Sequence, residues 1–228
     1  MNETALRAWR KATRHALIAR RLAIPAAALA RLRATIDSHI ERAFPGLARG
    51  TVAICWPFQN EYDARHLARR LRDRGAVIAL PVVVAPRSPL VFREWHPGVA
   101  MAHGVYDIPY PADTPEAVPD TVIVPMNGFD AGGYRLGYGG GFFDRTLAAR
   151  GAKPLTIGVA FELARLATIY PQPYDVPMDF VVTERGVYER REGRLDFLGA
   201  PHAGPGSPLA SPPCYAQDVD PSYFGEDG

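Results

Sequence analysis

The sequence predicts an α/β fold with three layers, in which a largely parallel sheet lies between helices and the N-terminal helices pack against it. Short apolar runs alternate along the chain with longer segments of helical periodicity. The apolar runs are rich in Val and Ile, and several of them end at Pro, as buried strands do. Strands that alternate with helices in this way favour parallel pairing, because each helix carries the chain back across the sheet.

Two helices are predicted before the first strand. Residues 5–22 place Leu6 and Leu17 on one side and arginines on the others, and Pro25 suits the start of a second helix that extends to residue 44. Further helices are predicted over residues 63–74 and 145–150. The predicted strands are residues 51–56, 77–80, 90–95, 122–124, 155–160, 180–183 and 186–188.

Four of these strands have ends that could contribute to a ligand site. They are the segments 57–61, 126–128 and 161–162 and the single residue Pro81. Ligands of open α/β sheets bind outside the carboxyl ends of the strands. We therefore expect all four strand ends to open onto one crevice.

Composition narrows the class of protein. The chain of 228 residues has a net charge of +2, which gives no indication of nucleic-acid binding. No membrane-spanning run or secretory signal is visible, so a cytoplasmic protein is expected, as a monomer or a homodimer. Residues 1–199 are predicted to form one domain, and the Pro-, Ser- and Gly-rich residues 200–228 a loosely ordered tail. Cys55 and Cys214 are expected to be free thiols, Cys55 within a buried strand.

The most informative segment is a glycine-rich run between residues 130 and 144. It lies between a predicted strand and a predicted helix, an order that binds phosphate through backbone N–H groups. Arg135 offers a planar pair of donors to phosphate, and Asp144 is placed to cap the helix or to hold a metal ion. The run lacks the lysine of a P-loop, and a glycine cluster by itself also suits a structural turn.

At this point the chain resembles the 5-formyltetrahydrofolate cyclo-ligases, also called 5,10-methenyltetrahydrofolate synthetases. The resemblance covers roughly residues 8 to 190. It depends on Val124-Pro125, Phe129-Asp130 and Gly133-Tyr-Arg135-Leu-Gly137-Tyr-Gly139-Gly-Gly141-Phe-Phe-Asp144.

The resemblance implies an enzyme that uses Mg²⁺ and ATP to cyclise 5-formyltetrahydrofolate to 5,10-methenyltetrahydrofolate through a phosphorylated formyl group, releasing ADP and phosphate. It implies that Arg135 and Asp144 are catalytic and that Asp144 holds the metal. The implied substrate-binding residues are Phe58, Glu61, Phe142 and Phe143. The implied ATP-binding residues are Arg10, Arg14, Arg135, Gly137, Tyr138, Gly139, Gly140, Gly141, Phe142 and Asp144.

Other interpretations stay open for several of these residues. The N-terminal arginines also suit a solvated basic helix face, Glu61 suits a surface position, and at least one of Phe142 and Phe143 suits the core. Tyr138 is expected to be exposed within the loop. Turn chemistry explains Asp175-Val-Pro without any catalysis, and neither Asp175 nor Asp179 is predicted to be catalytic.

The chain also departs from the family pattern at three positions. Arg10 stands in place of a lysine, Ala164 or a neighbour in place of a glutamine, and Tyr174 in place of a histidine. A diverged member that binds folate or nucleotide without turnover is therefore one alternative. An enzyme related to the sugar-phosphate isomerase-like α/β folds, acting without ATP, is another.

Overall fold

A computed structural model describes residues 1–104, 107–149, 151 and 153–200 of the chain. Residues 201–228, which include Cys214 and nearly all of the predicted tail, lie outside the described part.

The described residues form the predicted α/β fold around one mixed sheet. Its strand order is β12-β11-β10-β9-β6-β1-β2-β3. The pairs formed within β2-β1-β6-β9-β10 are all parallel, whereas β3, β11 and β12 join the sheet antiparallel. The strands are β1 (Thr51–Ala53), β2 (Val77–Val82), β3 (Val91–Glu94), β6 (Thr121–Pro125), β9 (Leu155–Val159), β10 (Phe180–Thr183), β11 (Gly186–Arg191) and β12 (Arg194–Gly199).

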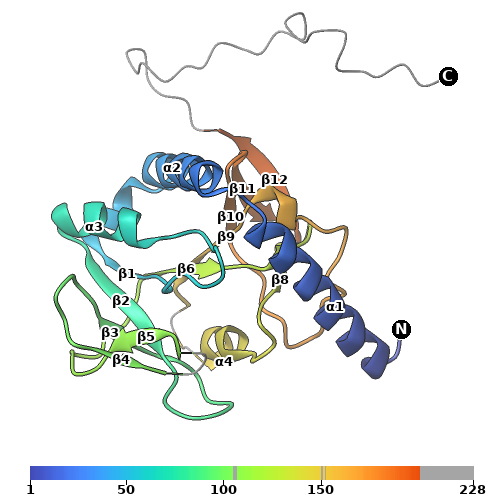
Figure 1. The fold of residues 1–228 in the computed structure, drawn as a ribbon, viewed down its shortest axis with the longest axis horizontal. Coiled ribbons are helices and arrows are strands. Elements are labelled where there is room, and N and C mark those ends of the chain that lie inside the picture. Colours follow the sequence, from blue (N-terminus) through green and yellow to red (C-terminus); the bar gives the residue numbers. More distant parts are fainter. Residues whose placement is uncertain (105–106, 150, 152, 201–228) are drawn as a thin grey trace, which may run out of the picture.

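Helices cover both faces of this sheet (Figure 1). α2 (Ala26–Ala43) and α3 (Arg65–Asp73) pack on one face, where Ile36, Ile40 and Leu67 join a cluster with alternate residues of the central strands. α4 (Phe142–Ala149) packs on the other face through Leu147. Because neighbouring strand residues point to opposite faces, Val52 joins the first cluster and Ala53 the second.

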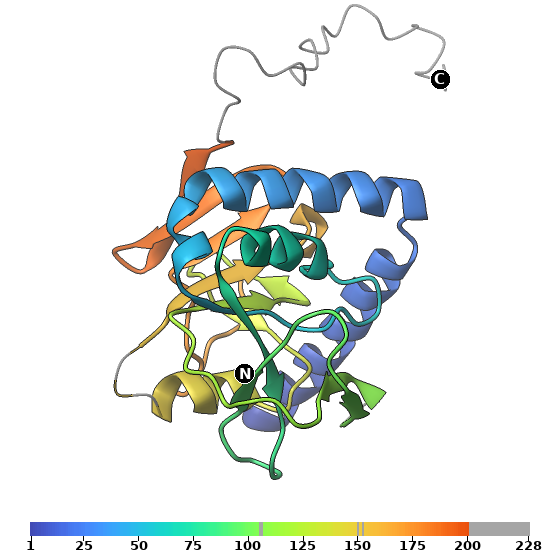
Figure 2. The same ribbon diagram turned by 90° about the vertical axis from the view of Figure 1, so that its left-hand side faces the viewer.

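α1 (Glu3–Leu22) takes a different position from α2. It runs beside the loops at the carboxyl ends of the strands instead of covering a face of the sheet, as Figure 2 shows. Leu17 packs with Leu136 and Ile169, and the helix also contacts the 3₁₀ turn Glu162–Ala164. The predicted packing of the N-terminal helices is thus confirmed for α2, and α1 closes the edge at which ligands of such folds bind.

The structure differs from the sequence prediction around the glycine run. A short hairpin of β7 (Gly128–Phe129) and β8 (Arg135–Leu136) separates β6 from the glycine loop. The Asp130 carboxylate closes its turn by accepting hydrogen bonds from the N–H groups of Gly132 (3.0 Å) and Tyr134 (3.2 Å). Such short strands have no alternating apolar pattern, so periodicity does not reveal them.

Other boundaries shift for similar reasons. The first strand ends at Ala53, well before the predicted residue 56, and β2 continues through Pro81, which pairs with Phe92 of β3. The sequence predicts residues 107–111 as extended, but it does not predict that β5 (Pro109–Pro111) pairs with β4 (Met101–His103), nor the last strand, β12. A short 3₁₀ turn, Pro45–Arg49, follows α2.

No helix in the described part of the chain is both long enough and apolar enough to span a membrane.

Candidate functional site

A cavity of about 830 Å³ lies at the carboxyl ends of β1, β2 and β6. β2 and β6 lie on opposite sides of β1, so the cavity is at the point where the strand order reverses, which is where open α/β sheets bind ligands. Every residue predicted for the site lines it: Arg10, Arg14, Phe58, Glu61, Arg135, Gly137, Tyr138, Gly139, Gly140, Gly141, Phe142, Phe143 and Asp144.

The glycine loop, residues 137–141, joins β8 to α4 along this cavity. Gly139 and Gly141 have φ angles of 92° and 64°, which side-chain-bearing residues rarely adopt. A Cβ atom on Gly140 would lie 2.8 Å from the Phe142 ring. Glycine is therefore required at these positions both for the backbone turn and for space beside the first residue of α4.

Asp144 lies in the first turn of α4, inside the helix. The predicted capping role is therefore wrong, because an N-cap residue precedes the first helical residue. Its Oδ1 instead lies 2.9 Å from Nη2 of Arg135 and accepts a hydrogen bond of 3.0 Å from the Val176 N–H. The Asp144 side chain is 23% exposed, so the carboxylate remains accessible from the cavity.

Arg135 is a buried cation beneath the loop, with its side chain 5% exposed. Its Nη1 donates to the Val176 carbonyl at 2.9 Å, and its guanidinium lies 5.7 Å from the centre of the Phe143 ring. Burial lowers the pKa of the Arg135 guanidinium, and Asp144 and Asp175 act in the opposite direction. An arginine starts from a pKa above 12, so the site keeps a fixed positive charge in a poorly hydrated position.

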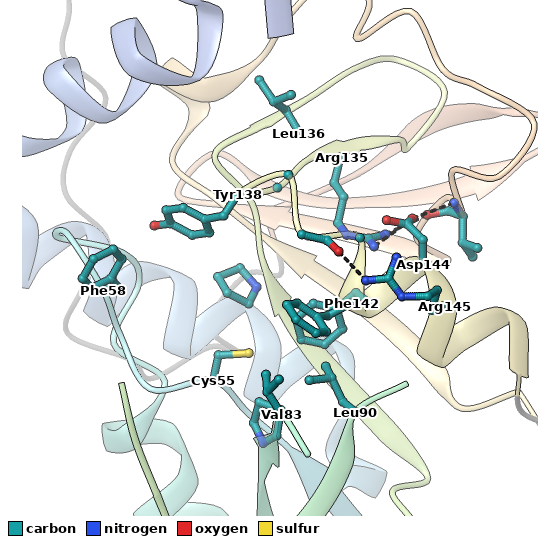
Figure 3. A pocket seen from close by; sticks show the side chains of 18 of the residues that line it. Cys55, Phe58, Val83, Leu90, Arg135, Leu136, Tyr138, Phe142, Asp144 and Arg145 are labelled. Atoms are coloured by element: carbon teal, nitrogen blue, oxygen red, sulfur yellow. Dashed lines mark hydrogen bonds and ion pairs between the residues drawn. The ribbon is translucent and has the colours of Figure 1, made fainter. Parts of the chain in front are cut away.

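Arg145 is a lining residue that the sequence analysis missed. It donates from Nη2 to the Gly140 carbonyl, and its guanidinium lies 5.3 Å from the Phe142 ring centre (Figure 3). Its Nε is buried with no hydrogen-bond partner in the described part of the protein. The sequence predicts Arg145 only as part of the helix over residues 145–150. Its position directly after Asp144, in the first turn of that helix, is the signal that points to the cavity.

At the other end of the cavity, Tyr138 reaches from the loop to the predicted substrate-binding residues (Figure 3). Its hydroxyl donates to Oε1 of Glu61 at 2.9 Å, and its ring centre lies 5.7 Å from that of Phe58. Glu61 is 5% exposed, so it is not a surface residue. Tyr138 is half-buried in this contact, which corrects the expectation that it is exposed.

The two N-terminal arginines have different partners. Arg14 donates from Nε to the Gly137 carbonyl at 2.5 Å, so it lies directly against the glycine loop. Arg10 forms an ion pair of 2.6 Å with Asp175 and donates to the carbonyls of Ile169 and Tyr170. Arg10 therefore anchors the segment that carries Asp175, although it also lines the cavity.

The apolar lining lies between these two ends. Phe142 and Phe143 are half-buried and pack against the second core cluster, so they combine a core contact with a surface on the cavity. Cys55 is also half-buried and lines the cavity, whereas the sequence predicted it within a buried strand. Burial, and then the charge of Glu61, raise the pKa of the Cys55 thiol, which disfavours the reactive thiolate form.

The prediction that four strand ends share one crevice is wrong for two of them. Met126, Asn127 and Phe161 do not line the large cavity but a second, small one of about 10 Å³. Leu17 and Arg21 of α1 also line the small cavity, and Glu61 lines both cavities. Of the positions at which the chain departs from the family pattern, Ala164 lines the small cavity. Tyr174 lines the large cavity and is exposed.

Asp175 has a local contact expected of a turn residue, whereas Asp179 contacts the separate strand β9. Asp175 accepts from the Gln172 N–H at 2.7 Å, and Asp179 accepts from the Thr156 N–H at 2.9 Å. Among the described residues, no group of three or more His, Cys, Asp or Glu side chains is arranged to hold a metal ion. Any metal bound at Asp144 therefore requires most of its ligands from a bound molecule and water.

Comparisons with known proteins identify close similarities. The sequence profile of the 5-formyltetrahydrofolate cyclo-ligase family matches residues 6–184. The 5-formyltetrahydrofolate cyclo-ligase of Escherichia coli (strain K12) is 33% identical over 153 residues, which cover 64% of this chain and 84% of that protein. The enzyme of the same name from Mycolicibacterium smegmatis is 33% identical over 150 residues, covering 62% of this chain and 77% of that protein.

Solved structures agree with these matches. The 5,10-methenyltetrahydrofolate synthetase of Aquifex aeolicus superposes with a TM-score of 0.70 at 26% identity, covering 81% of this chain and 94% of that one. A 5,10-methenyltetrahydrofolate synthetase from Mycoplasma pneumoniae has the same fold, with a TM-score of 0.63 at 22% identity over 77% of this chain and 98% of that one.

Proposed function

The chain belongs to the 5-formyltetrahydrofolate cyclo-ligase family, and we propose that it is an enzyme that uses ATP and Mg²⁺ to convert 5-formyltetrahydrofolate to 5,10-methenyltetrahydrofolate. The observation that carries this proposal is the single cavity, which contains both the glycine loop with its charged neighbours and the segment with Phe58 and Glu61. The reaction needs two different molecules side by side, and a cavity of about 830 Å³ at a strand-order reversal suits that requirement.

The chemistry requires activation of the formyl oxygen. The formyl oxygen attacks the γ-phosphorus of ATP, and ADP is released. The oxygen, which was a poor leaving group, is now part of a phosphate ester and can leave as phosphate. N10 of the folate then attacks the formyl carbon. The carbon–oxygen bond breaks with loss of phosphate, and the N10 proton is released to give the methenyl bridge between N5 and N10. No step needs a nucleophilic side chain, so positioning and charge neutralisation are what the protein must supply.

Arg135 and the glycine loop are suited to the phosphate side of this reaction. The buried guanidinium offers a fixed positive charge, and the loop presents backbone N–H groups where α4 begins. Arg14 lies against the same loop and adds a second cation. These groups are in place before the phosphoryl group moves, so they stabilise developing charge without reorganising.

Asp144 fits a Mg²⁺ ion that arrives with the nucleotide. Mg²⁺ uses one or two carboxylates together with phosphate oxygens and water, which matches a site with one accessible carboxylate in the first turn of a helix. Arg135 Nη2 and the Val176 N–H both contact the same oxygen of the Asp144 carboxylate, Oδ1. When bound, the ion supplies positive charge to the phosphate oxygens.

Glu61 is suited to the folate side. A pterin ring presents an amino–amide edge of donors, and a buried carboxylate accepts from such an edge with both oxygens. Phe58, Phe142 and Phe143 line the cavity and offer flat apolar surfaces to the ring.

A spectrophotometric turnover assay tests the proposal. We expect growth of the methenyl absorption band when the protein is mixed with 5-formyltetrahydrofolate, ATP and Mg²⁺, and no growth when ATP or Mg²⁺ is omitted. Turnover without ATP would instead support an isomerase-like enzyme. Calorimetric binding of either ligand with no change in the band would support a diverged binding protein.

A further inference from the structure

Arg21 is a buried cation that the proposed reaction does not yet use. It lies in the last turn of α1 and is 5% exposed. Its donors contact three oxygens: the Gln59 carbonyl (2.8 Å), Oδ1 of Asn127 (2.9 Å) and the Tyr138 hydroxyl (3.0 Å). It lines the small cavity but not the large one, so it does not reach a ligand directly.

The anion nearest to this cation in the described structure is Glu61, with 3.9 Å between Nη2 of Arg21 and Oε1 of Glu61. Oε1 accepts from the Tyr138 hydroxyl, and Oε2 accepts from the Phe58 N–H at 3.1 Å. Tyr138 thus receives a hydrogen bond from the arginine and gives one to the carboxylate. Both oxygens of the carboxylate have their direction set by the protein before any ligand binds.

The charge of Glu61 depends on these neighbours. Burial raises the pKa of the Glu61 carboxyl, whereas Arg21, and then the hydrogen bonds from Tyr138 and Phe58, lower it. The titratable groups that face the carboxylate are Arg21 from α1, Tyr138 from the glycine loop and Cys55 after β1. Burial raises the pKa of both Tyr138 and Cys55, so they are neutral at physiological pH and Arg21 is the positive charge among them.

We propose that Arg21 is a positioning residue that keeps the Glu61 carboxylate ionised and aimed at the folate substrate. This inference rests on the proposed function, because it takes Glu61 as the acceptor for the pterin edge. A protonated Glu61 presents a donor where the pterin also presents donors, so loss of the charge removes recognition even when the fold is intact. Arg21 acts on Glu61, the residue proposed for the folate, and does not line the large cavity, so its loss should affect folate binding more than nucleotide binding.

The test is Arg21→Met, with the KM for each substrate measured between pH 6 and 9. We expect the KM for 5-formyltetrahydrofolate to rise about tenfold or more at pH 7 and the KM for ATP to stay within about twofold. Without Arg21 the pKa of Glu61 is higher, so raising the pH restores the carboxylate, and the folate KM should fall towards the wild-type value near pH 9. Arg20→Met is the matched control, because Arg20 is exposed and does not line the cavity.

Two further variants separate this role from a general structural one. In a Glu61→Gln background, Arg21→Met should add little to the folate KM, because no charge is left to maintain. Arg21→Lys keeps the positive charge but loses the planar N–H donors of the guanidinium. We therefore expect the KM for 5-formyltetrahydrofolate to rise a few fold while its pH profile stays that of the wild type. Arg21→Lys also gives the answer if Arg21→Met fails to fold.

The inference is overturned if the folate KM is unchanged, or if both KM values rise together at every pH. Calorimetric titration with 5-formyltetrahydrofolate should show the same pH dependence in Kd, so the result does not require turnover. A wild-type protein that binds folate but shows no turnover would therefore count against the proposed function, while the variants would still decide the role of Arg21.

Discussion

The two ends of the cavity each pair an acid with an arginine, but the two pairs are built differently. At the end with the glycine loop, proposed to bind phosphate and called the phosphate end below, the side chain of Asp144 is 23% exposed and lies 2.9 Å from Arg135. At the end with Phe58 and Glu61, proposed to bind folate and called the folate end below, the side chain of Glu61 is 4% exposed and lies 3.9 Å from Arg21, with Tyr138 hydrogen-bonded to both. An accessible acid suits a metal ion that comes and goes with its nucleotide, whereas a buried acid suits selective hydrogen bonding to a flat ring.

The two carboxylates also differ in their surroundings. Asp144 contacts the Arg135 guanidinium directly, and its carboxylate is accessible from the cavity. Burial raises the pKa of Glu61, so that carboxylate depends on the surrounding network. The two ends should therefore respond differently to substitution and to pH.

The largest effect is expected from exchanging each acid for its amide. Asp144→Asn should lower kcat/KM for ATP by about 10²–10³-fold and leave the Kd for folate within about twofold, because charge stabilisation at the phosphate is lost. Glu61→Gln should weaken folate binding by about 10–100-fold and leave the Kd for nucleotide unchanged. Steady-state kinetics and calorimetry measure both, and Asp73→Asn, on the exposed side of α3, is the control. Loss of both affinities in either variant would mean that the two ends are not separate.

A smaller effect should distinguish the two N-terminal arginines. Arg14→Ala should raise the KM for ATP about tenfold with little change in melting temperature, because Arg14 lies at the glycine loop. Arg10→Ala should lower the melting temperature and change both KM values modestly, because its donors hold residues 169, 170 and 175. Thermal unfolding and kinetics on the two variants provide the measurement. A selective ATP defect in Arg10→Ala would assign that arginine to the nucleotide instead.

The smallest effect concerns Asp179, which is outside the cavity and serves as a reference for structural acids. Burial by itself would raise the pKa of Asp179, but hydrogen bonds from Lys153 and Thr156 hold it below its usual range. Its stabilising contribution is therefore complete above the unfolded pKa of about 4 and is lost as the pH falls through the lower folded pKa. Asp179→Asn should lower the melting temperature by about 2–4 °C at pH 7 and by less at pH 3. An equal decrease at both values would show that the carboxylate charge does not matter.

All the site residues predicted from the sequence line the cavity, but Arg145 was missed and the exposure of Tyr138 was wrong. Arg135, the loop glycines and Asp144 are neighbours in the chain, so one motif contains them, and the structure places them together in the cavity. Arg145 was missed because a charged residue on a helix has no distinct pattern. Tyr138 was predicted as exposed, since a glycine loop says nothing about where its one large side chain points.

Sequence periodicity likewise predicted some elements of the fold and missed others. The helices α1, α2 and α3 and the parallel strands follow from periodicity, and their predicted positions agree with the structure within a few residues. The hairpin β7–β8 and the position of α1 do not follow from periodicity, because short strands have no repeating pattern and an amphipathic helix does not specify which surface it covers.

The sequence by itself determined the α/β class, two of the strand ends that line the cavity and the glycine-rich run, because each is a local pattern of backbone freedom and side-chain polarity. Only the tertiary structure decided that α1 crosses the carboxyl edge and brings Arg21 to Glu61 and Tyr138, residues from three separate segments. The physical reason is that burial raises the pKa of the Glu61 carboxyl and Arg21 lowers it. Both effects depend on how distant segments of the chain pack against each other.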